Sequence, residues 1–229
     1  PLASSSAASD VYKRQALHLP NPHLETRAAL PGHTAGVLCC AASSTWSIAV
    51  TGSADHSVIV WDLNRCRFVR QLKEPDQPIQ LVAIDDQRGW IAAAAGSEVW
   101  VWSINGFLLV HQSTRSATND PPSSMIFVAR DFHVDKLGVL VTGHRDCIVM
   151  WDIVSNHARA TPPRWRLEKN TVLSLRQSSK VTCLYMPNTS TLCTGHEDGE
   201  VYVWTIPGAA TLPKAPQEQC IGQCDHRFG

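Results

Sequence analysis

The sequence lacks an excess of charge of either sign and also lacks a long apolar run. Its 20 basic and 20 acidic side chains balance at neutral pH, whereas a dedicated nucleic-acid-binding domain usually carries a clustered basic excess. The longest apolar run, Trp90–Ala95, is far shorter than the ~20 residues that a membrane-spanning helix needs. We therefore expect a soluble chain of 229 residues that binds no nucleic acid.

Motifs for the common catalytic chemistries are missing as well. The sequence contains no Gly-x-x-x-x-Gly-Lys, His-Glu-x-x-His or Gly-x-Ser-x-Gly phrase, which excludes these phosphate-binding, zinc-protease and nucleophile motifs. His144-Arg145-Asp146 has the letters of a kinase catalytic loop, but the other kinase motifs are absent. We interpret this tripeptide as a tight turn, and we predict that the chain is not an enzyme and needs no cofactor.

Residues 1–29 do not show the order of a secretory signal, in which a basic region precedes an apolar one, and we expect them to form a flexible tail. Eight cysteines would suit a disulfide-linked secreted domain. Five of them sit inside apolar, strand-like runs, namely Cys39, Cys40, Cys147, Cys183 and Cys193. Reduced, buried thiols in a cytoplasmic protein are the better interpretation.

What the sequence does contain is a phrase that occurs four times and each time includes a tryptophan. The four copies are Thr51–Leu63, Ala95–Ile104, Thr142–Ile153 and Thr194–Ile206. Their tryptophans are Trp61, Trp102, Trp151 and Trp204, at intervals of 41, 49 and 53 residues. A period that starts near ~40–45 residues and lengthens by loop insertion is typical of four-stranded propeller blades.

Each unit shows the same order of strands. An apolar run leads to a turn, a second run ends in Thr-Gly or Ala-Gly, and a third run ends at the tryptophan. The segment after it, such as Phe68–Leu72 or Phe107–Val110, supplies a fourth strand. The sequence thus predicts an all-β propeller whose four blades cover residues 30–72, 73–110, 111–165 and 166–206, with a linker after them.

These phrases resemble the WD40 family. In the pattern of that family a turn Asp, a His, a Ser or Thr hydroxyl and the Trp indole form one buried chain of hydrogen bonds. The first unit matches the pattern through His33, Ser53, Asp55 and Trp61. The resemblance implies that these four side chains are structural and fix the geometry of the first blade.

The other three units keep only part of the pattern. Their retained turn and indole positions are Trp102 in the second unit, Asp146 and Trp151 in the third, and Asp198 and Trp204 in the fourth. The fourth unit has His196 where the first has its Ser, and we expect His33 and His196 to bond within their blades. Because the chain of donors and acceptors is incomplete, we expect these three blades to be held mainly by apolar packing.

Two phrases point to a narrower family. Trp61–Leu72, which opens Trp-Asp-Leu-Asn, and Val101–Leu109, which contains Trp-Ser-Ile-Asn-Gly, resemble the propeller of the BEACH-WD40 proteins. Pro163–Leu167, with its Arg-Trp pair, is similar to the ALFY-like branch, whose members carry WD repeats and a FYVE domain. Over residues 30–206 the resemblance implies a non-catalytic scaffold in membrane trafficking and selective autophagy. It also implies a cytoplasmic location, peripheral to endosomal or autophagic membranes.

Residues 207–229 contain two further cysteines, Cys220 and Cys224, followed by Phe228. FYVE zinc fingers open with zinc-binding cysteines separated by two residues, whereas three residues separate this pair. Two thiolates cannot complete a tetrahedral zinc site. Two alternatives remain: the start of a truncated FYVE finger, with zinc bound only if the finger continues, or a tail with two incidental cysteines.

Because WD40 rings commonly have about seven blades, within the four to eight of propellers, four blades predict an incomplete ring and a later part of a larger propeller. The expected partners are other proteins or peptides held on one rim, with membranes reached only indirectly through BEACH and FYVE regions. The basic segment Arg159–Lys180 suits either an anionic partner or a solvated insertion loop. The alternative function is a generic WD40 adaptor for signalling or ubiquitin-ligase assembly.

Overall fold

The computed structural model describes residues 26–73, 75–128, 136–155, 165–175, 179–188 and 190–206. The chain divides into two compact units, Pro1–Leu30 and Pro31–Gly229. All strands described below belong to the second unit, and only residues 26–30 of the first unit are described.

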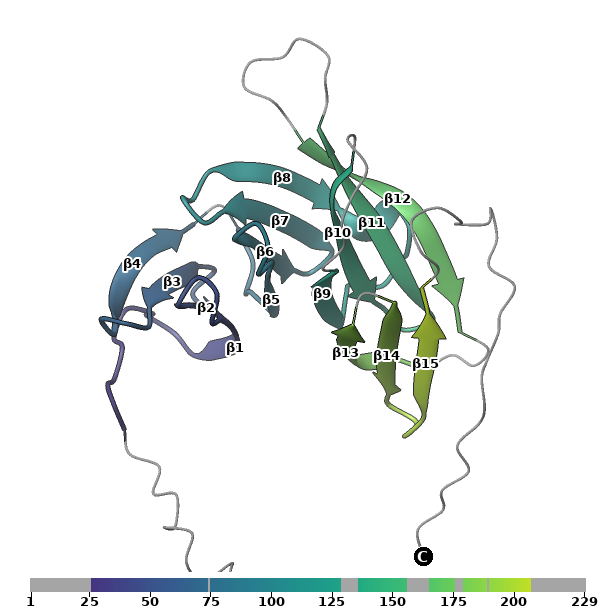
Figure 1. Cartoon of the computed structure of the whole chain (residues 1–229), viewed down its shortest axis with the longest axis horizontal. Helices are drawn as coiled ribbons and strands as arrows, with labels where there is room; N and C mark the ends of the chain where they lie inside the picture. Colours follow the sequence, from purple (N-terminus) through teal and green to yellow (C-terminus); the bar gives the residue numbers. More distant parts are fainter. Residues whose placement is uncertain are drawn as a thin grey trace, which may run out of the picture. The chain divides into compact units, whose positions relative to one another are not determined.

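The described part of the second unit is built from four antiparallel sheets in which neighbours in sequence are also neighbours in space (Figure 1). The first sheet contains β1 (Val37–Ser43), β2 (Ile48–Ser53), β3 (Val58–Asp62) and β4 (Arg67–Leu72). The second contains β5 (Leu81–Ile84), β6 (Trp90–Ala95), β7 (Glu98–Ser103) and β8 (Leu108–Ser113). The third contains β9 (Ser124–Val128), β10 (Lys136–Gly143), β11 (Cys147–Ser155) and β12 (Trp165–Ser174). The fourth contains β13 (Val181–Asn188), β14 (Thr191–His196) and β15 (Val201–Thr205).

This arrangement confirms the predicted all-β propeller with four blades. A single 3-10 turn, Thr114–Ser116, is the only helical element among the described residues. Within those residues no helix is long and apolar enough to cross a membrane. The sheets follow the predicted order because each strand is followed by a short connection that leads the chain back beside it.

One predicted blade boundary is wrong. The sequence placed the border between the third and fourth blades at residues 165 and 166, which is the start of β12. β12 pairs with β11 along its length, from Ser155 opposite Trp165 to Cys147 opposite Ser174, so it belongs to the third blade. The error arose because the long insertion before Trp165 looked like the end of a repeat, and only the pairing partner identifies an outer strand.

Three apolar layers hold the blades together, one between each pair of consecutive sheets. The first layer joins Val50, Val58 and Val60 to residues such as Ile91 and Trp102 of the second sheet. β6 is buried along its whole length because sheets cover both of its faces. The second layer lies between the second and third sheets, and the third between the third and fourth. The blades therefore form a stack in which each inner sheet is covered on both sides.

The glycine that follows the threonine of β2 is explained by close packing between blades. A Cβ on Gly52 would overlap the side chain of Ile79 and lie 2.7 Å from Cys39 Sγ. Gly143 in the third blade has the same problem with Val181, 2.6 Å away. Because the next blade begins directly against these backbones, a side chain here would push two sheets apart.

Candidate functional site

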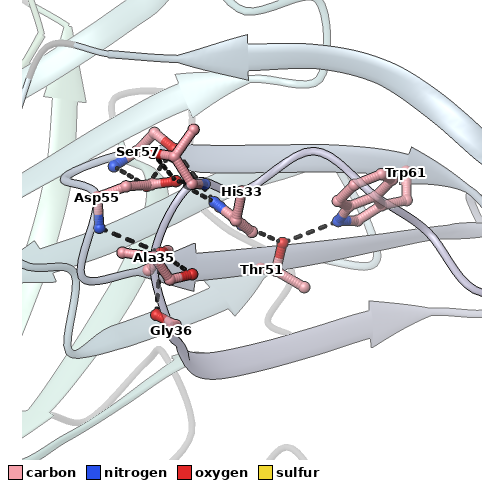
Figure 2. A network of polar contacts seen from close by, with 9 residues as sticks. His33, Ala35, Gly36, Thr51, Asp55, Ser57 and Trp61 are labelled. Atoms are coloured by element: carbon pink, nitrogen blue, oxygen red, sulfur yellow. Dashed lines mark hydrogen bonds and ion pairs between the residues drawn. The ribbon is translucent and has the colours of Figure 1, made fainter.

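A chain of polar contacts crosses the first blade from its entry segment to its third strand (Figure 2). Trp61 Nε1 donates to Thr51 Oγ1 at 2.8 Å, and the same hydroxyl lies 2.8 Å from His33 Nε2. His33 Nδ1 lies 2.9 Å from Asp55 Oδ2. A neutral imidazole with its proton on Nδ1 satisfies all three bonds, since the threonine hydroxyl can then donate to Nε2.

The structure places His33, Asp55 and Trp61 in the predicted chain but replaces the predicted hydroxyl. Thr51, not Ser53, joins the imidazole to the indole. In the register of β2 and β3, Ala49 lies opposite Trp61. Thr51 is therefore the diagonal neighbour that the indole can reach, while Ser53 lies two residues farther along the strand.

Ser53 has a different structural role, which is to join the entry segment to the turn. Its Oγ contacts the backbone carbonyls of Gly36 at 2.9 Å and Ala35 at 3.2 Å. The same oxygen accepts from Asp55 N–H at 3.1 Å. Ser53 is fully buried, so these bonds keep both the segment before β1 and the β2–β3 turn in place.

The Asp55 carboxylate accepts hydrogen bonds from three residues at the end of this chain, namely His33, Thr34 and Ser57. Besides His33, it accepts from Thr34 N–H at 2.8 Å, from Ser57 N–H at 3.0 Å and from Ser57 Oγ at 2.6 Å. Burial by itself would raise the pKa of Asp55, but the hydrogen bonds from Ser57, Thr34 and His33 outweigh it and hold the pKa well below the ordinary 3.8. The carboxylate is therefore charged at neutral pH and organises the entry to the blade.

The third blade contains a related chain of hydrogen bonds, which includes the histidine of its Thr-Gly-His phrase, His144. His144 Nε2 lies 2.9 Å from Thr142 Oγ1, which accepts from Trp151 Nε1 at 2.8 Å. On its other side His144 Nδ1 lies 2.9 Å from the Asp120 carbonyl and 3.0 Å from Thr118 Oγ1. Burial lowers the pKa of His144, with the Asp120 carbonyl acting in the opposite direction, so the buried ring is neutral.

The fourth blade repeats this chain with one bond fewer. His196 Nε2 lies 2.9 Å from Thr194 Oγ1, and Trp204 Nε1 donates to that oxygen at 3.1 Å. His196 is buried, and its Nδ1 has no hydrogen-bond partner among the described residues. The prediction that His196 is bonded within its blade is confirmed. The expectation that the third and fourth blades lack the bonds between histidine, hydroxyl and indole is wrong, because the Thr-Gly-His phrase supplies both the histidine and the hydroxyl.

In the second blade the tryptophan is held by apolar packing, as predicted. Trp102 is fully buried among Ile91, Ala93 and Ala95. Ala93 stands where the first blade has Thr51, opposite a residue two positions before the tryptophan. Trp102 Nε1 consequently has no hydrogen-bond partner among the described residues.

The predicted turn carboxylates of the last two blades lie at exposed positions. Asp198 Oδ1 accepts from Glu200 N–H at 3.0 Å, and this backbone bond is the main cause that lowers the pKa of Asp198. Asp146 accepts from Leu175 N–H at 3.0 Å through its backbone carbonyl. Neither carboxylate occupies the place of Asp55, because His144 and His196 approach from within the sheet rather than from an entry segment.

The cysteines are free in the described part of the chain. Cys39, Cys147 and Cys193 are half-buried, and burial raises the pKa of Cys39 to about 11. Cys40 and Cys183 are exposed, so their predicted burial is wrong. Cys40 lies on the face of the first sheet that points away from the second sheet, and Cys183 lies on the face of the fourth sheet that points away from the third.

No cluster of three metal-binding side chains occurs among the residues that the structure describes. Cys220 and Cys224, and residues 159–164 of the basic segment, lie outside the described residues. Several buried polar groups form the histidine–threonine–tryptophan chains, which join neighbouring strands. These hydrogen-bonded chains hold in place the strands that carry the surface loops.

Comparison with known proteins identifies the repeats. The family model for the WD domain, G-beta repeat, matches residues 24–62 and 169–205. The solved structure of the computationally designed Ika4 protein is similar with a TM-score of 0.55 and 22% sequence identity, and the match covers 81% of this chain and 100% of the designed one. This likeness concerns the fold alone.

Three curated relatives align with the chain, two of them over more than four fifths of it and the third over two fifths. BEACH domain-containing protein A2 of Arabidopsis thaliana is 30% identical over 216 residues, 84% of this chain and 6% of that protein. Human WD repeat- and FYVE domain-containing protein 4 is 29% identical over 216 residues, 81% of this chain and 7% of that protein. The human lysosomal-trafficking regulator is 33% identical over 97 residues, 40% of this chain and 3% of that protein. The chain thus spans only a small part of each relative.

Proposed function

Since this chain consists of WD40 repeats whose relatives include BEACH domain-containing proteins, we propose that it is the protein-interaction scaffold module of a BEACH-WD40 protein acting in membrane trafficking. The observation that carries the proposal is the alignment of four fifths of the chain with such relatives. The similarity to the human lysosomal-trafficking regulator supports a role in membrane trafficking.

The polar chains of the blades support the scaffold part of the proposal. Buried, fully bonded side chains hold β2 and β3 of the first blade and the entry segment in one geometry. A framework fixed in this way presents its loops at defined positions, so little ordering is needed when a partner binds. The partners are accordingly other proteins or peptides, and the module works without catalysis.

Within the BEACH-WD40 group we propose an ALFY-like role in selective autophagy, at endosomal or autophagic membranes reached through other regions of a longer protein. The likeness to WD repeat- and FYVE domain-containing protein 4 supports this assignment. Cys220 and Cys224 remain candidates for the first ligands of a FYVE finger, and zinc would bind there only with further ligands.

The trafficking proposal can be tested by expressing the tagged chain in cultured cells, where it should compete with the full-length relative for partners. We expect slower delivery of an endocytosed cargo to lysosomes, followed by fluorescence microscopy. A designed propeller of the same fold, expressed at the same level, serves as the control and should leave delivery unchanged. Unchanged delivery with abundant, folded chain would contradict the proposal.

A generic WD40 adaptor for signalling or ubiquitin-ligase assembly is the second candidate. It is favoured by the family model, which describes WD repeats in general and covers only the first and fourth units. In the same cells, recovery of the chain with ubiquitin-ligase subunits together with normal cargo delivery would support this adaptor function over the trafficking one.

A further inference from the structure

The outermost strands of consecutive blades meet differently on the two sides of the second sheet. On one side β8 and β12 pack together. The side-chain amide of Gln112 joins them, since its Nε2 donates to the Leu167 carbonyl at 2.9 Å and its Oε1 accepts from Leu167 N–H at 3.0 Å. On the other side no comparable contact joins β4 to β8. Both blades of this second pair are present in the chain, so the difference lies in their own residues.

Two residues of β4 explain why the outer strands of the first and second blades do not pack together. In the register of the two sheets, Leu72 takes the position of Gln112, and Arg70 takes that of Val110. A leucine side chain has no group that could bond to a neighbouring backbone as the glutamine amide does. Val110 is buried against the next blade, whereas an arginine in its place could be buried only with a partner for its charge.

Arg70 is a half-buried cation that forms no ion pair with any carboxylate of the described residues. Its Nη1 donates to the backbone carbonyl of Asn105, in the turn before β8. A Cβ on Gly106 of the same turn would lie 2.9 Å from this nitrogen, so the turn holds the guanidinium closely. Its Nε is buried and has no hydrogen-bond partner in the described part of the chain. Because a guanidinium carries five N–H donors, most of its hydrogen-bonding capacity is unused.

Positive charge exceeds negative charge around this guanidinium. Arg65 and Arg67 lie on the same β3–β4 hairpin as Arg70 and are exposed. Among the described residues Asp62 is the one carboxylate that pairs with them, at 3.6 Å from Arg65 and 3.9 Å from Arg67. Three guanidinium groups are thus balanced by a single carboxylate. The excess charge complements an acidic group on a partner and disfavours a basic one.

The apolar part of the same surface lies on β8. Leu108 is 45% exposed and lies opposite Trp102, which is buried against the first sheet, so Leu108 faces the first sheet as well. Farther along β8 the ring of His111 stacks on Trp100, with 7° between the ring planes, and its Nε2 lies 3.3 Å from Glu98 Oε2. The carboxylate of Glu98 repels an acidic group at this end. An acidic group is therefore directed to the arginine end, beside Leu108.

We propose that the surface between β4 and β8 binds an extended peptide of a partner protein in which an acidic residue lies close to an apolar one. The peptide carboxylate pairs with Arg70, and the apolar side chain packs on Leu108. Among the described strands β4 and β8 are the last of their sheets (Figure 1), so an extended peptide can also bond to the free backbone groups of one edge. The inference rests on the proposed scaffold function, for which it names the chemistry of one partner.

Selection of random peptides displayed on phage against the immobilised full chain tests the proposal. We expect the selected peptides to share an Asp or Glu close to a Phe, Leu or Trp. Fluorescence anisotropy of the synthetic, fluorescein-labelled peptides then measures their affinity. Arg70→Glu should weaken binding at least about tenfold, because the peptide carboxylate then meets a like charge. Binding to the wild type should also weaken as the salt concentration rises.

Matched variants separate this surface from the rest of the chain. Leu108→Asp, at an exposed position, should also weaken binding and serves as the second variant should Arg70→Glu fail to fold, as judged by near-ultraviolet circular dichroism. Arg145→Glu and Tyr185→Asp change exposed residues of other blades and should leave the affinity unchanged. A peptide with Lys in place of its acidic residue should bind Arg70→Glu more tightly than it binds the wild type.

Three results would overturn the proposal. The first is a selection that enriches no peptide with an acidic residue near an apolar one. The second is a set of selected peptides that bind Arg70→Glu and Leu108→Asp as tightly as the wild type. The third is a dimer of the wild-type chain in sedimentation velocity that Arg70→Glu dissociates, since the surface would then bind a second copy. Cargo delivery is not measured in these assays, so the trafficking proposal and this inference can fail separately.

Discussion

At the scale of single residues, Asp55 is the group on which the first blade depends most. Its carboxylate accepts from His33, Thr34 and Ser57, so removing it leaves several buried donors without an acceptor. We expect Asp55→Ala to lower the free energy of unfolding by about 2–4 kcal/mol. Asp146→Ala should cost less, because that residue lies at an exposed turn. Chemical denaturation of both variants checks the order, and equal losses would contradict it.

The low pKa of Asp55 makes the stability of the chain depend on pH. The hydrogen bonds hold the folded-state pKa below the 3.8 of an ordinary aspartate, so the folded state binds fewer protons than the unfolded state. The stabilisation is complete above about pH 4–5 and is lost as pH falls through the folded-state value. Asp55→Asn cannot titrate, and its thermal melting should show a shallower loss below pH 4 than the wild type. Parallel curves would exclude Asp55 as the source.

At the scale of the blade, the hydroxyl under the tryptophan decides what the indole contributes. Trp151 donates to Thr142, whereas Trp102 is equally buried but has no acceptor for its N–H. Trp151→Phe should therefore destabilise the chain by about 1 kcal/mol more than Trp102→Phe. Urea denaturation measures both. In a Thr142→Val background the difference should shrink, since the acceptor is then missing from the third blade as well.

The blade is also the scale at which sequence analysis partly failed. Alternating apolar residues and turns were sufficient to predict the strands and their order. They could not show that β12 pairs with β11, because pairing is a relation between two segments rather than a property of one. For the same reason Thr51 was missed in favour of Ser53, although the Thr-Gly phrase recurs in three of the four units and was itself a signal.

At the scale of the whole molecule, we expect a strand to unfold locally less often when neighbouring sheets bury both of its faces. β6 is buried on both faces, whereas β15 has exposed valines and one partner strand among the described residues. We expect the amides of β6 and β7 to exchange slowest in hydrogen-exchange mass spectrometry and those of β13 and β15 fastest. Dilute protein, below the concentration of any association, is the appropriate sample. Uniform protection across the four sheets would contradict this ranking.

The sequence by itself determined the repeat, the all-β class, the strand order and the places of His33, Asp55 and Trp61, because alternation and turn residues act over short stretches of chain. Tertiary structure alone decided which hydroxyl each indole reaches, how His144 and His196 enter their blades, and where the third blade ends. It also decided that Val201 and Val203 are exposed while Val58 and Val60 are buried. The same apolar strand is a core element or a surface depending on whether another sheet lies against it, and no local pattern records that neighbour.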